Sequence, residues 1–202
     1  MCEQVLGALG HCSNHWCSRA DRHFSVVWSL SPLTTPLRWA IGRFKYRAEG
    51  LWAGVFARLL VGFLDDHMPW FDGYDLLVPV PAYTGPGARR RWDHMGAIAG
   101  AMTPLAGSRW PVSAGAIVKV AETPAFARLP LAQRRSCAEA RLRHALVVPA
   151  GPAVRGARIL VLDDVFTEGS TLREVARAML RAGALEVAGL AIARQPWTRG
   201  PP

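Results

Sequence analysis

The last part of the chain alternates between strand and helix patterns, and this alternation restricts the fold more than any other feature of the sequence. Residues 158–162 predict a buried strand, because residues 159–162 are a continuous apolar run. Residues 171–182 place apolar side chains on one helical face, and the pattern stops before Gly183, which suits a helix end. Residues 186–193 predict a second strand. A strand, a helix and a strand within about 35 residues form a βαβ unit, so we predict an α/β fold with a parallel sheet flanked by helices.

The chain divides into three predicted segments. Residues 1–31 form a small N-terminal segment rich in cysteine and histidine, and Pro32 and Pro36 indicate a linker after it. We expect residues 32–71 to be a helical hood or linker region and residues 72–202 to form the α/β domain. The patterns further predict helices at 36–48, 51–65, 92–105 and 131–145, strands at 76–81, 116–120 and 146–148, and a turn region at 65–75.

Two acids and a small hydroxyl loop connect the predicted strand at 158–162 to the next helix. Asp163 and Asp164 follow the strand, and Thr167, Gly169, Ser170 and Thr171 lead into the helix. Ligands of parallel sheets collect at the carboxyl ends of strands, and loop N–H groups and hydroxyls at a helix N-terminus bind anions. The acids would accept hydrogen bonds from vicinal hydroxyls, so the set suits a phosphorylated sugar. Turn formation and helix capping would explain any one of these residues, but they explain the ordered set poorly.

The chain is strongly basic, with 24 Lys and Arg against 15 Asp and Glu and a net charge of +9. This charge favours anionic partners, which are nucleic acid, phosphorylated metabolites or a membrane surface. More than half of the excess lies in residues 72–150, which include Arg89, Arg90 and Arg91. A composition that is 50% hydrophobic and 19% charged excludes wholesale disorder.

The N-terminal half predicts neither export nor membrane insertion. The first residues lack the basic start and apolar stretch of a signal peptide, so we expect a cytoplasmic protein with reduced thiols. The most apolar run, 51–64, is shorter than the ~20 residues of a membrane span and is interrupted by Arg58, so we expect no membrane span.

Cysteine and histidine cluster in the first 23 residues, which raises the possibility of a zinc site. Cys12 and His15 have the spacing of a zinc knuckle, and Cys2 and Cys17 would complete a tetrahedral set. The sequence contains no second clean knuckle here, so a segment without metal is the alternative.

Residues 161–171 closely resemble the motif by which type I phosphoribosyltransferases bind phosphoribosyl pyrophosphate (PRPP). That motif is a hydrophobic strand, two acids, two variable residues and then Thr/Ser-Thr-Gly-x-Thr. The resemblance extends upstream, where the chain resembles the ComF family, and in total it covers residues 38–194. It rests on Asp-Leu-Leu-Val-Pro-Val-Pro at 75–81, Arg-Arg-Arg-Trp-Asp-His at 89–94, the block at 119–135 and Phe-Lys-Tyr-Arg at 44–47.

The resemblance implies roles for individual residues. Asp163 and Asp164 would hold the ribose hydroxyls of PRPP, and Arg90 and Lys119 would face its pyrophosphate together with Mg²⁺. The loop Thr167, Glu168, Gly169, Ser170 and Thr171 would cradle the 5-phosphate, with Asp163, Asp164 and Thr167 as the catalytic set. The N-terminal segment would match the family's small zinc ribbon, in degenerate form.

The chain departs from the family pattern at several polar positions. Glu168 replaces a threonine in the phosphate loop, Phe126 a glutamine and Cys137 an asparagine, while Arg91 stands where the family has glycine. A carboxylate 4 Å from a phosphate charge would cost about 4 kcal/mol at an effective dielectric constant of 20. Glu168 therefore either points away from the phosphate or weakens its binding.

Two classes of function follow from the resemblance. The first is an enzyme of the ComF type that transfers phosphoribosyl from PRPP to a nitrogen acceptor and releases pyrophosphate. The second is a non-catalytic adaptor in DNA uptake, with single-stranded DNA or the competence machinery as partner. For the arginines of the helix at 131–145, a solvated basic face is favoured over a nucleic-acid contact. For the tryptophans, core packing is favoured over base stacking at Trp28, Trp39, Trp52 and Trp70.

Overall fold

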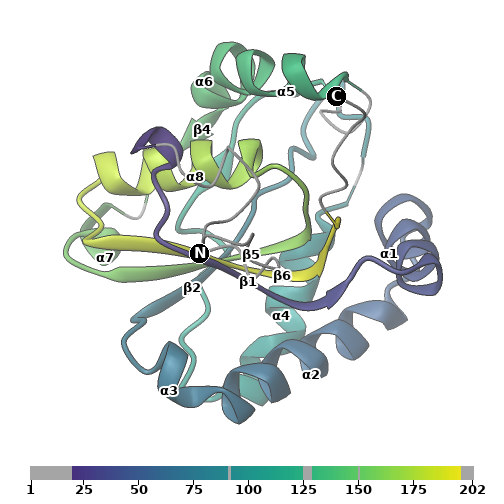
Figure 1. Ribbon diagram of the computed structural model, residues 1–202, viewed down its shortest axis with the longest axis vertical. Helices are drawn as coiled ribbons and strands as arrows, with labels where there is room; N and C mark the ends of the chain where they lie inside the picture. Colours follow the sequence, from purple (N-terminus) through teal and green to yellow (C-terminus); the bar gives the residue numbers. More distant parts are fainter. Residues whose placement is uncertain (1–19, 91, 125–128, 150, 197–202) are drawn as a thin grey trace, which may run out of the picture.

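The computed structural model describes residues 20–90, 92–124, 129–149 and 151–196. Its centre is a four-stranded sheet in the order β1-β6-β5-β2 (Figure 1). All three neighbouring pairs of strands are parallel, which confirms the predicted α/β class with a parallel sheet flanked by helices. The four strands are β1 (Val27–Pro32), β2 (Leu76–Pro79), β5 (Arg158–Phe166) and β6 (Glu186–Arg194).

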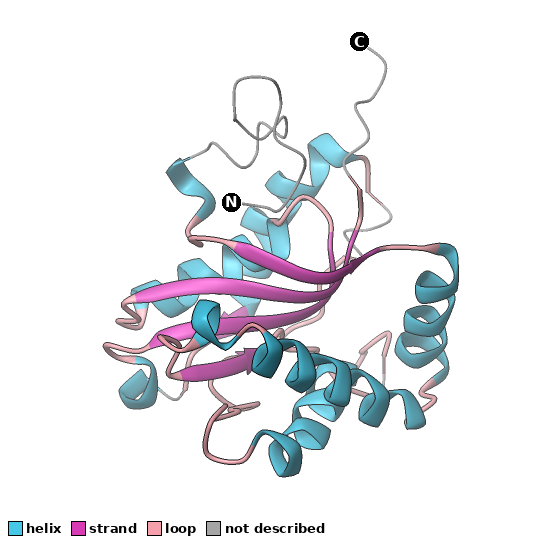
Figure 2. Ribbon diagram, turned by 60° about the horizontal axis from the view of Figure 1, so that its bottom comes forward, coloured by secondary structure: helices cyan, strands magenta, loops and turns pink. Residues whose placement is uncertain are grey.

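Helices cover both faces of this sheet (Figures 1 and 2). Each face has its own apolar core. Leu160 and Leu162 of β5 pack on one face, and Ile159 and Val161 pack on the other, as the alternation of a strand requires. The second face is covered by α8 (Ser170–Arg181). The first face is covered by α1 (Thr35–Arg47), α2 (Leu51–Asp66), α3 (Met68–Phe71) and α4 (His94–Ala106).

The βαβ unit predicted from the sequence is present as β5, α8 and β6. Helix α8 buries Leu172, Val175 and Met179, which recur at helical spacing. The chain leaves the helix through Gly183, whose φ of +100° is a left-handed conformation that glycine adopts without strain. Strand β5 continues to Phe166, beyond the predicted end at residue 162, so the two acids lie inside the strand.

The other predicted elements are found with shifted ends. The predicted helix at 131–145 is one continuous helical segment made of α5 (Leu131–Cys137), a π-helical turn (Ala138–Leu142) and α6 (Arg143–Ala145). Strands β3 (Val118–Lys119) and β4 (Leu146–Val147) pair antiparallel in a separate small sheet. The short helices η1 (Ala20–Arg22), α3 and α7 (Gly151–Val154) were not predicted.

Strand β1 is the element of the main sheet that the sequence did not predict. It pairs with β6, with Val27 opposite Gly189 and Ser31 opposite Ala193. Pro32, interpreted as part of a linker, is the last residue of this edge strand, a position where a missing N–H is tolerated. The boundary drawn at residue 31 therefore falls inside a strand of the main sheet.

The expectation that four tryptophans pack in the core is only partly correct. Trp28 packs against Phe71 with ring centroids 4.8 Å apart, and Trp52 is half-buried. Trp39 is 57% exposed and Trp70 is 51% exposed, so they lie mainly on the surface. In the described part of the chain, no helix combines the length and apolar character needed to cross a membrane.

Candidate functional site

A cavity of about 540 Å³ opens where β2 ends beside the longer strand β5. The Val80 N–H still donates to the Leu162 carbonyl at 2.9 Å, but Pro79 and Pro81 have no N–H with which to pair. Strand β5 continues to Phe166 because β6 pairs with its other edge. The cavity therefore lies at the carboxyl ends of parallel strands, where ligands of such sheets collect.

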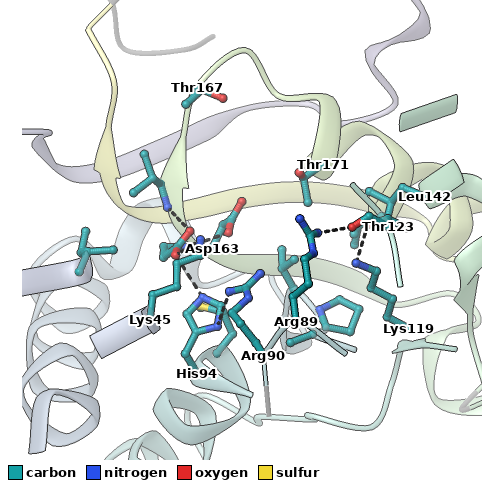
Figure 3. A pocket seen from close by; sticks show the side chains of 18 of the residues that line it. Lys45, Arg89, Arg90, His94, Lys119, Thr123, Leu142, Asp163, Thr167 and Thr171 are labelled. Atoms are coloured by element: carbon teal, nitrogen blue, oxygen red, sulfur yellow. Dashed lines mark hydrogen bonds and ion pairs between the residues drawn. The ribbon is translucent and has the colours of Figure 1, made fainter. Parts of the chain in front are cut away.

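Asp163 and Asp164 both line this cavity from inside β5. Asp164 is 4% exposed, and its carboxylate forms an ion pair with Lys45 of α1. The same oxygen lies 3.1 Å from Nε2 of His94, the first residue of α4. The Asp164 N–H donates to Oδ1 of Asp163 at 2.8 Å, so the two acids are coupled through the backbone. Figure 3 shows Lys45 and His94 converging on this end of β5.

A chain of hydrogen bonds runs from Arg90 through His94, both labelled in Figure 3, to Asp164. Arg90 Nη1 lies 3.3 Å from Nδ1 of His94. A guanidinium has only donors, so Nδ1 accepts from Arg90 and Nε2 carries the proton that His94 donates to Asp164. His94 thus links the predicted pyrophosphate-facing arginine to the second acid of the pair.

The surroundings shift the two neighbouring acids in opposite directions. Burial disfavours the charge of Asp164, but the Lys45 ammonium and the hydrogen bond from His94 outweigh burial and hold the pKa of Asp164 well below its ordinary value. Burial and the adjacent Asp164 charge raise the pKa of Asp163. Burial also opposes the charge of Lys45, but attraction to Asp164 raises the pKa of this lysine above its ordinary value. The site therefore holds one firmly ionised acid beside one that binds a proton more readily.

The loop after β5 turns sharply at Gly169. Its φ is +88°, and a Cβ at this position would lie 3.1 Å from the Phe166 ring and 3.3 Å from the Phe24 ring. Glycine is thus needed both for the conformation and for the space. The turn brings Thr167 and Thr171 to the large cavity. Gly169 and Ser170 line a separate cavity of about 20 Å³, so the structure divides the predicted phosphate loop between two cavities.

The Glu168 side chain is only 6% exposed and borders both cavities. Its Oε2 accepts a hydrogen bond from the Thr167 hydroxyl at 2.5 Å. The same oxygen pairs with Nη1 of Arg134, from α5, at 3.0 Å. The carboxylate therefore does not point into solvent, and it engages a hydroxyl of the predicted phosphate loop.

Basic side chains form the wall of the cavity opposite the acids. Lys119 Nζ donates to the Thr123 hydroxyl at 2.6 Å, and burial, together with the charges of Arg90 and Arg89, lowers the pKa of Lys119 although Glu122 opposes the shift. Arg89 pairs with Glu122 at 3.2 Å and donates to the Thr123 carbonyl. Arg90 and Lys119 therefore line the same cavity as the acid pair, as Figure 3 shows.

The interpretation of the arginine-rich helix as a solvated basic face is wrong for three of its four arginines. Arg134 pairs with Glu168, Arg135 with Asp21, and Arg143 with Glu174 at 2.9 Å. Glu174, on α8, is fully buried. The arginine-rich segment at 131–145 packs beside α8, so its arginines compensate the charge of this buried carboxylate. Arg141 is the exposed member of the set.

Sequence reasoning missed the roles of three side chains in this arrangement. Lys45 was noted only within the Phe-Lys-Tyr-Arg element, and His94 only within the Arg-Arg-Arg-Trp-Asp-His block. Arg134 was interpreted as part of a solvated basic face. A signal was available for Lys45, since it is one of only two lysines in the chain. Pairing across the fold gives no local signal for His94 or Arg134.

The predicted zinc ligands Cys2, Cys12, His15 and Cys17 lie outside the described residues. Phe126 and Arg91 also lie outside them, and Cys137 is a half-buried free thiol. Within the described ranges, no group of three or more His, Cys, Asp or Glu side chains could hold a metal ion.

Comparison with known proteins agrees with the site at the end of β5. Residues 122–202 match the family model described as "Phosphoribosyl transferase domain". The matched region contains Asp163, Asp164 and the loop from Thr167 to Thr171, together with α8 and β6. No curated protein matches the chain. The similarity to a phosphoribosyltransferase domain therefore extends over residues 122–202.

Proposed function

We propose that the chain binds Mg²⁺-PRPP in the cavity at the end of β5 and transfers its phosphoribosyl group to a nitrogen acceptor, with release of pyrophosphate. The observation that supports this most is that three chemically distinct groups line one cavity. These are the acid pair Asp163 and Asp164, the hydroxyl residues Thr167 and Thr171, and the cations Arg90 and Lys119. PRPP combines a sugar diol, a phosphate monoester and a pyrophosphate, which these groups would bind respectively.

The ribose hydroxyls would be bound by the two acids. Asp164 is already ionised and engaged by Lys45 and His94, so Lys45 must move or share the carboxylate when a diol binds. Asp163 faces the cavity with fewer competing charges and accepts a backbone N–H on Oδ1. Asp163 is therefore the main acceptor for the diol in this proposal, and Asp164 anchors the neighbouring cations.

The residues present fit a Mg²⁺ ion that arrives with its ligand. Mg²⁺ is commonly held by one or two carboxylates together with phosphate oxygens of a substrate. Asp163 supplies such a carboxylate at the cavity wall. Bound there, Mg²⁺ would neutralise charge on the pyrophosphate.

In the proposed reaction, the bond between ribose C1 and the pyrophosphate oxygen breaks while a bond forms between C1 and the acceptor nitrogen. The acceptor releases its N–H proton to water, and the pyrophosphate leaves with the electron pair of the broken bond. Positive charge develops on C1 and negative charge gathers on the leaving group. Arg90 and Lys119 would therefore stabilise the transition state more than the bound substrate. Arg90 is held for this task by its hydrogen bond to His94.

Assignment to the ComF type rests mainly on residues before the matched domain. Phe44 is fully buried, and Lys45 contacts Asp164. Ile41 and Tyr46 of the same helix line the cavity. Helix α1 would thus cover the acceptor side of the site and select the acceptor.

The adaptor function remains as the second candidate, supported by the exposed Arg141 and Trp39. Its support is weakened by the use of Arg134, Arg135 and Arg143 in ion pairs within the chain. A salt-dependent shift of single-stranded DNA that is lost in R141Q would favour this candidate.

A pyrophosphate-release assay tests the transfer itself. The protein is incubated with Mg²⁺, PRPP and nitrogen bases of several classes, and pyrophosphate is measured against the same mixtures without protein. Release that depends on a base and is lost in D163N supports the transferase. If Mg²⁺-PRPP stabilised the fold but no base caused release of pyrophosphate, the protein would bind PRPP without transferase activity.

A further inference from the structure

The Glu168 carboxylate is bound by the kinds of hydrogen-bond donor that a phosphate would need. It accepts from the Thr167 hydroxyl at 2.5 Å and pairs with the Arg134 guanidinium at 3.0 Å. A hydroxyl and a guanidinium are also the usual donors to a phosphate oxygen. Glu168 and Arg134 come from separate elements, the loop after β5 and helix α5, so the pair joins two walls of the cavity.

The contacts of Glu168 with Thr167 and Arg134 occupy hydrogen-bond donors that would otherwise be available to a ligand. A threonine hydroxyl has one proton to donate, so Thr167 cannot donate to a phosphate while it donates to Glu168. The Arg134 side chain is 19% exposed and the Glu168 side chain is 6% exposed, so water screens this pair weakly. A phosphate entering beside the carboxylate would meet a like charge at close range.

We propose that Glu168 is an internal anion that fills the phosphate position of the free protein, and that Arg134 passes from this carboxylate to the phosphate monoester when ligand binds. The inference rests on the proposed function for the location of the phosphate at this loop. The exchange keeps Arg134 neutralised in both states, so Glu168 can move out without leaving a buried unpaired cation.

The loop offers a place for the displaced carboxylate. Glu168 also borders the cavity of about 20 Å³, which Arg22, Arg135 and Arg173 line on the other side of the loop. A rotation of the side chain away from the large cavity keeps the carboxylate among positive charges. Gly169, next in sequence, is the residue of this loop in the left-handed conformation.

The chemical class of ligand follows from the exchange. A phosphate monoester carries close to two negative charges near neutral pH and can replace a carboxylate that carries one. A ligand whose anionic group is itself a carboxylate gains no such advantage over Glu168. The internal anion therefore favours phosphate monoesters over carboxylates at this position and weakens the binding of both.

The test uses ribose 5-phosphate, titrated by calorimetry into the full chain and its variants. E168Q keeps the shape of the side chain and removes its charge, so we expect at least tenfold tighter binding than in the unchanged protein. The double variant E168Q/R134Q should lose at least tenfold relative to E168Q, because the phosphate then has no Arg134 guanidinium to bind. Equal affinity of E168Q and the unchanged protein, or equal affinity of E168Q and E168Q/R134Q, would overturn the inference.

Two control variants test charge effects that are not local. E49Q removes the carboxylate of another arginine–glutamate pair, Arg43 with Glu49, which does not line either described cavity. R141Q removes an exposed arginine from the same helical segment as Arg134. Both should leave the affinity for ribose 5-phosphate within twofold. If E49Q tightened binding as much as E168Q, net charge would explain the gain and the inference would be wrong.

E168T provides a second variant in case E168Q does not fold. It removes the carboxylate and supplies another hydroxyl, and it should tighten ribose 5-phosphate binding in the same direction. Titration with Mg²⁺-PRPP separates the inference from the proposed function. Binding of PRPP that is equal in all variants would overturn only the internal-anion inference. Binding of ribose 5-phosphate that responds to Glu168, without any binding of PRPP, would overturn only the proposed function.

Discussion

Lys45 on α1 and Asp164 on β5 form an ion pair although they lie 119 residues apart in the sequence. The pair joins the helix that precedes the matched domain to the acid pair of that domain. Since Asp164 is 4% exposed, the lysine compensates a carboxylate that would otherwise be buried with fewer partners. The N-terminal region thus contributes directly to the charge of the proposed PRPP site.

K45M should lower the free energy of unfolding by about 3 kcal/mol, because it leaves the Asp164 charge buried without its ammonium partner. Urea denaturation of K45M and the unchanged protein measures this difference. R47M, at an exposed position of the same helix, is the control and should stay within 0.5 kcal/mol, the usual range for surface changes. Equal stability of K45M and the unchanged protein would show that the pair contributes no stability.

The two adjacent acids should give opposite dependences of stability on pH. The pKa of Asp164 is lowered by folding, so its contribution is present above its ordinary pKa of 3.8 and is lost as the pH falls below that value. D164N should therefore cost most at neutral pH and progressively less in acid. The pKa of Asp163 is raised, so its ionisation opposes folding as the pH rises above 3.8, and D163N should gain stability relative to the unchanged protein in that direction.

Unfolding free energies measured by urea titration from pH 3 to pH 8 check these trends. If D163N and D164N shifted the pH profile in the same direction, the proposed division of charge between the two acids would be wrong.

G169A should destabilise the protein by more than G87A. Both glycines have positive φ, +88° and +75°, so each substitution places alanine in a left-handed conformation that costs about 1–2 kcal/mol. At Gly169 the new Cβ also meets the rings of Phe166 and Phe24, whereas at Gly87 no atom lies within 4 Å. Thermal unfolding compares the two variants. An equal loss would mean that the rings move away freely.

E174Q should lower the free energy of unfolding by about 3 kcal/mol, since it removes the charge that compensates several buried or half-buried arginines. The Glu174 carboxylate is fully buried and pairs with Arg143, Arg173 and Arg177. E49Q, which breaks a more exposed pair with Arg43, is the matched control and should cost no more than about 1 kcal/mol. Chemical denaturation of both variants measures the difference, and similar small losses would contradict a structural role of the arginine-rich helix.

The sequence was sufficient for the parts of the fold that depend on local pattern. The strand at β5, the helix α8 and the turn at Gly169 each follow from a run of neighbouring residues, and so does the order of acids and hydroxyls between them. Strand β1 was missed because an edge strand that alternates serine with apolar residues and ends in proline has no strong pattern of its own.

The electrostatic part of the site could not be predicted, because it depends on which charges the fold brings together. Glu168 was identified as a departure from the phosphate-loop pattern, but its partner Arg134 lies 34 residues away on a helix that was interpreted as a solvated surface. The same holds for His94, which meets Asp164 across the layer between helix and sheet. Opposite charges at such separations give no periodic signal.

Calorimetric titration of Mg²⁺-PRPP into the unchanged protein and into D163N/D164N tests the proposed PRPP site most directly. D72N, at an exposed aspartate outside the described cavities, is the control for the loss of an acid. We expect saturable one-to-one binding that is retained in D72N and abolished in the double variant, with a thermal unfolding transition showing that the double variant is folded. Absence of binding to the unchanged protein, or equal binding to D163N/D164N, would contradict the assignment of this cavity to PRPP.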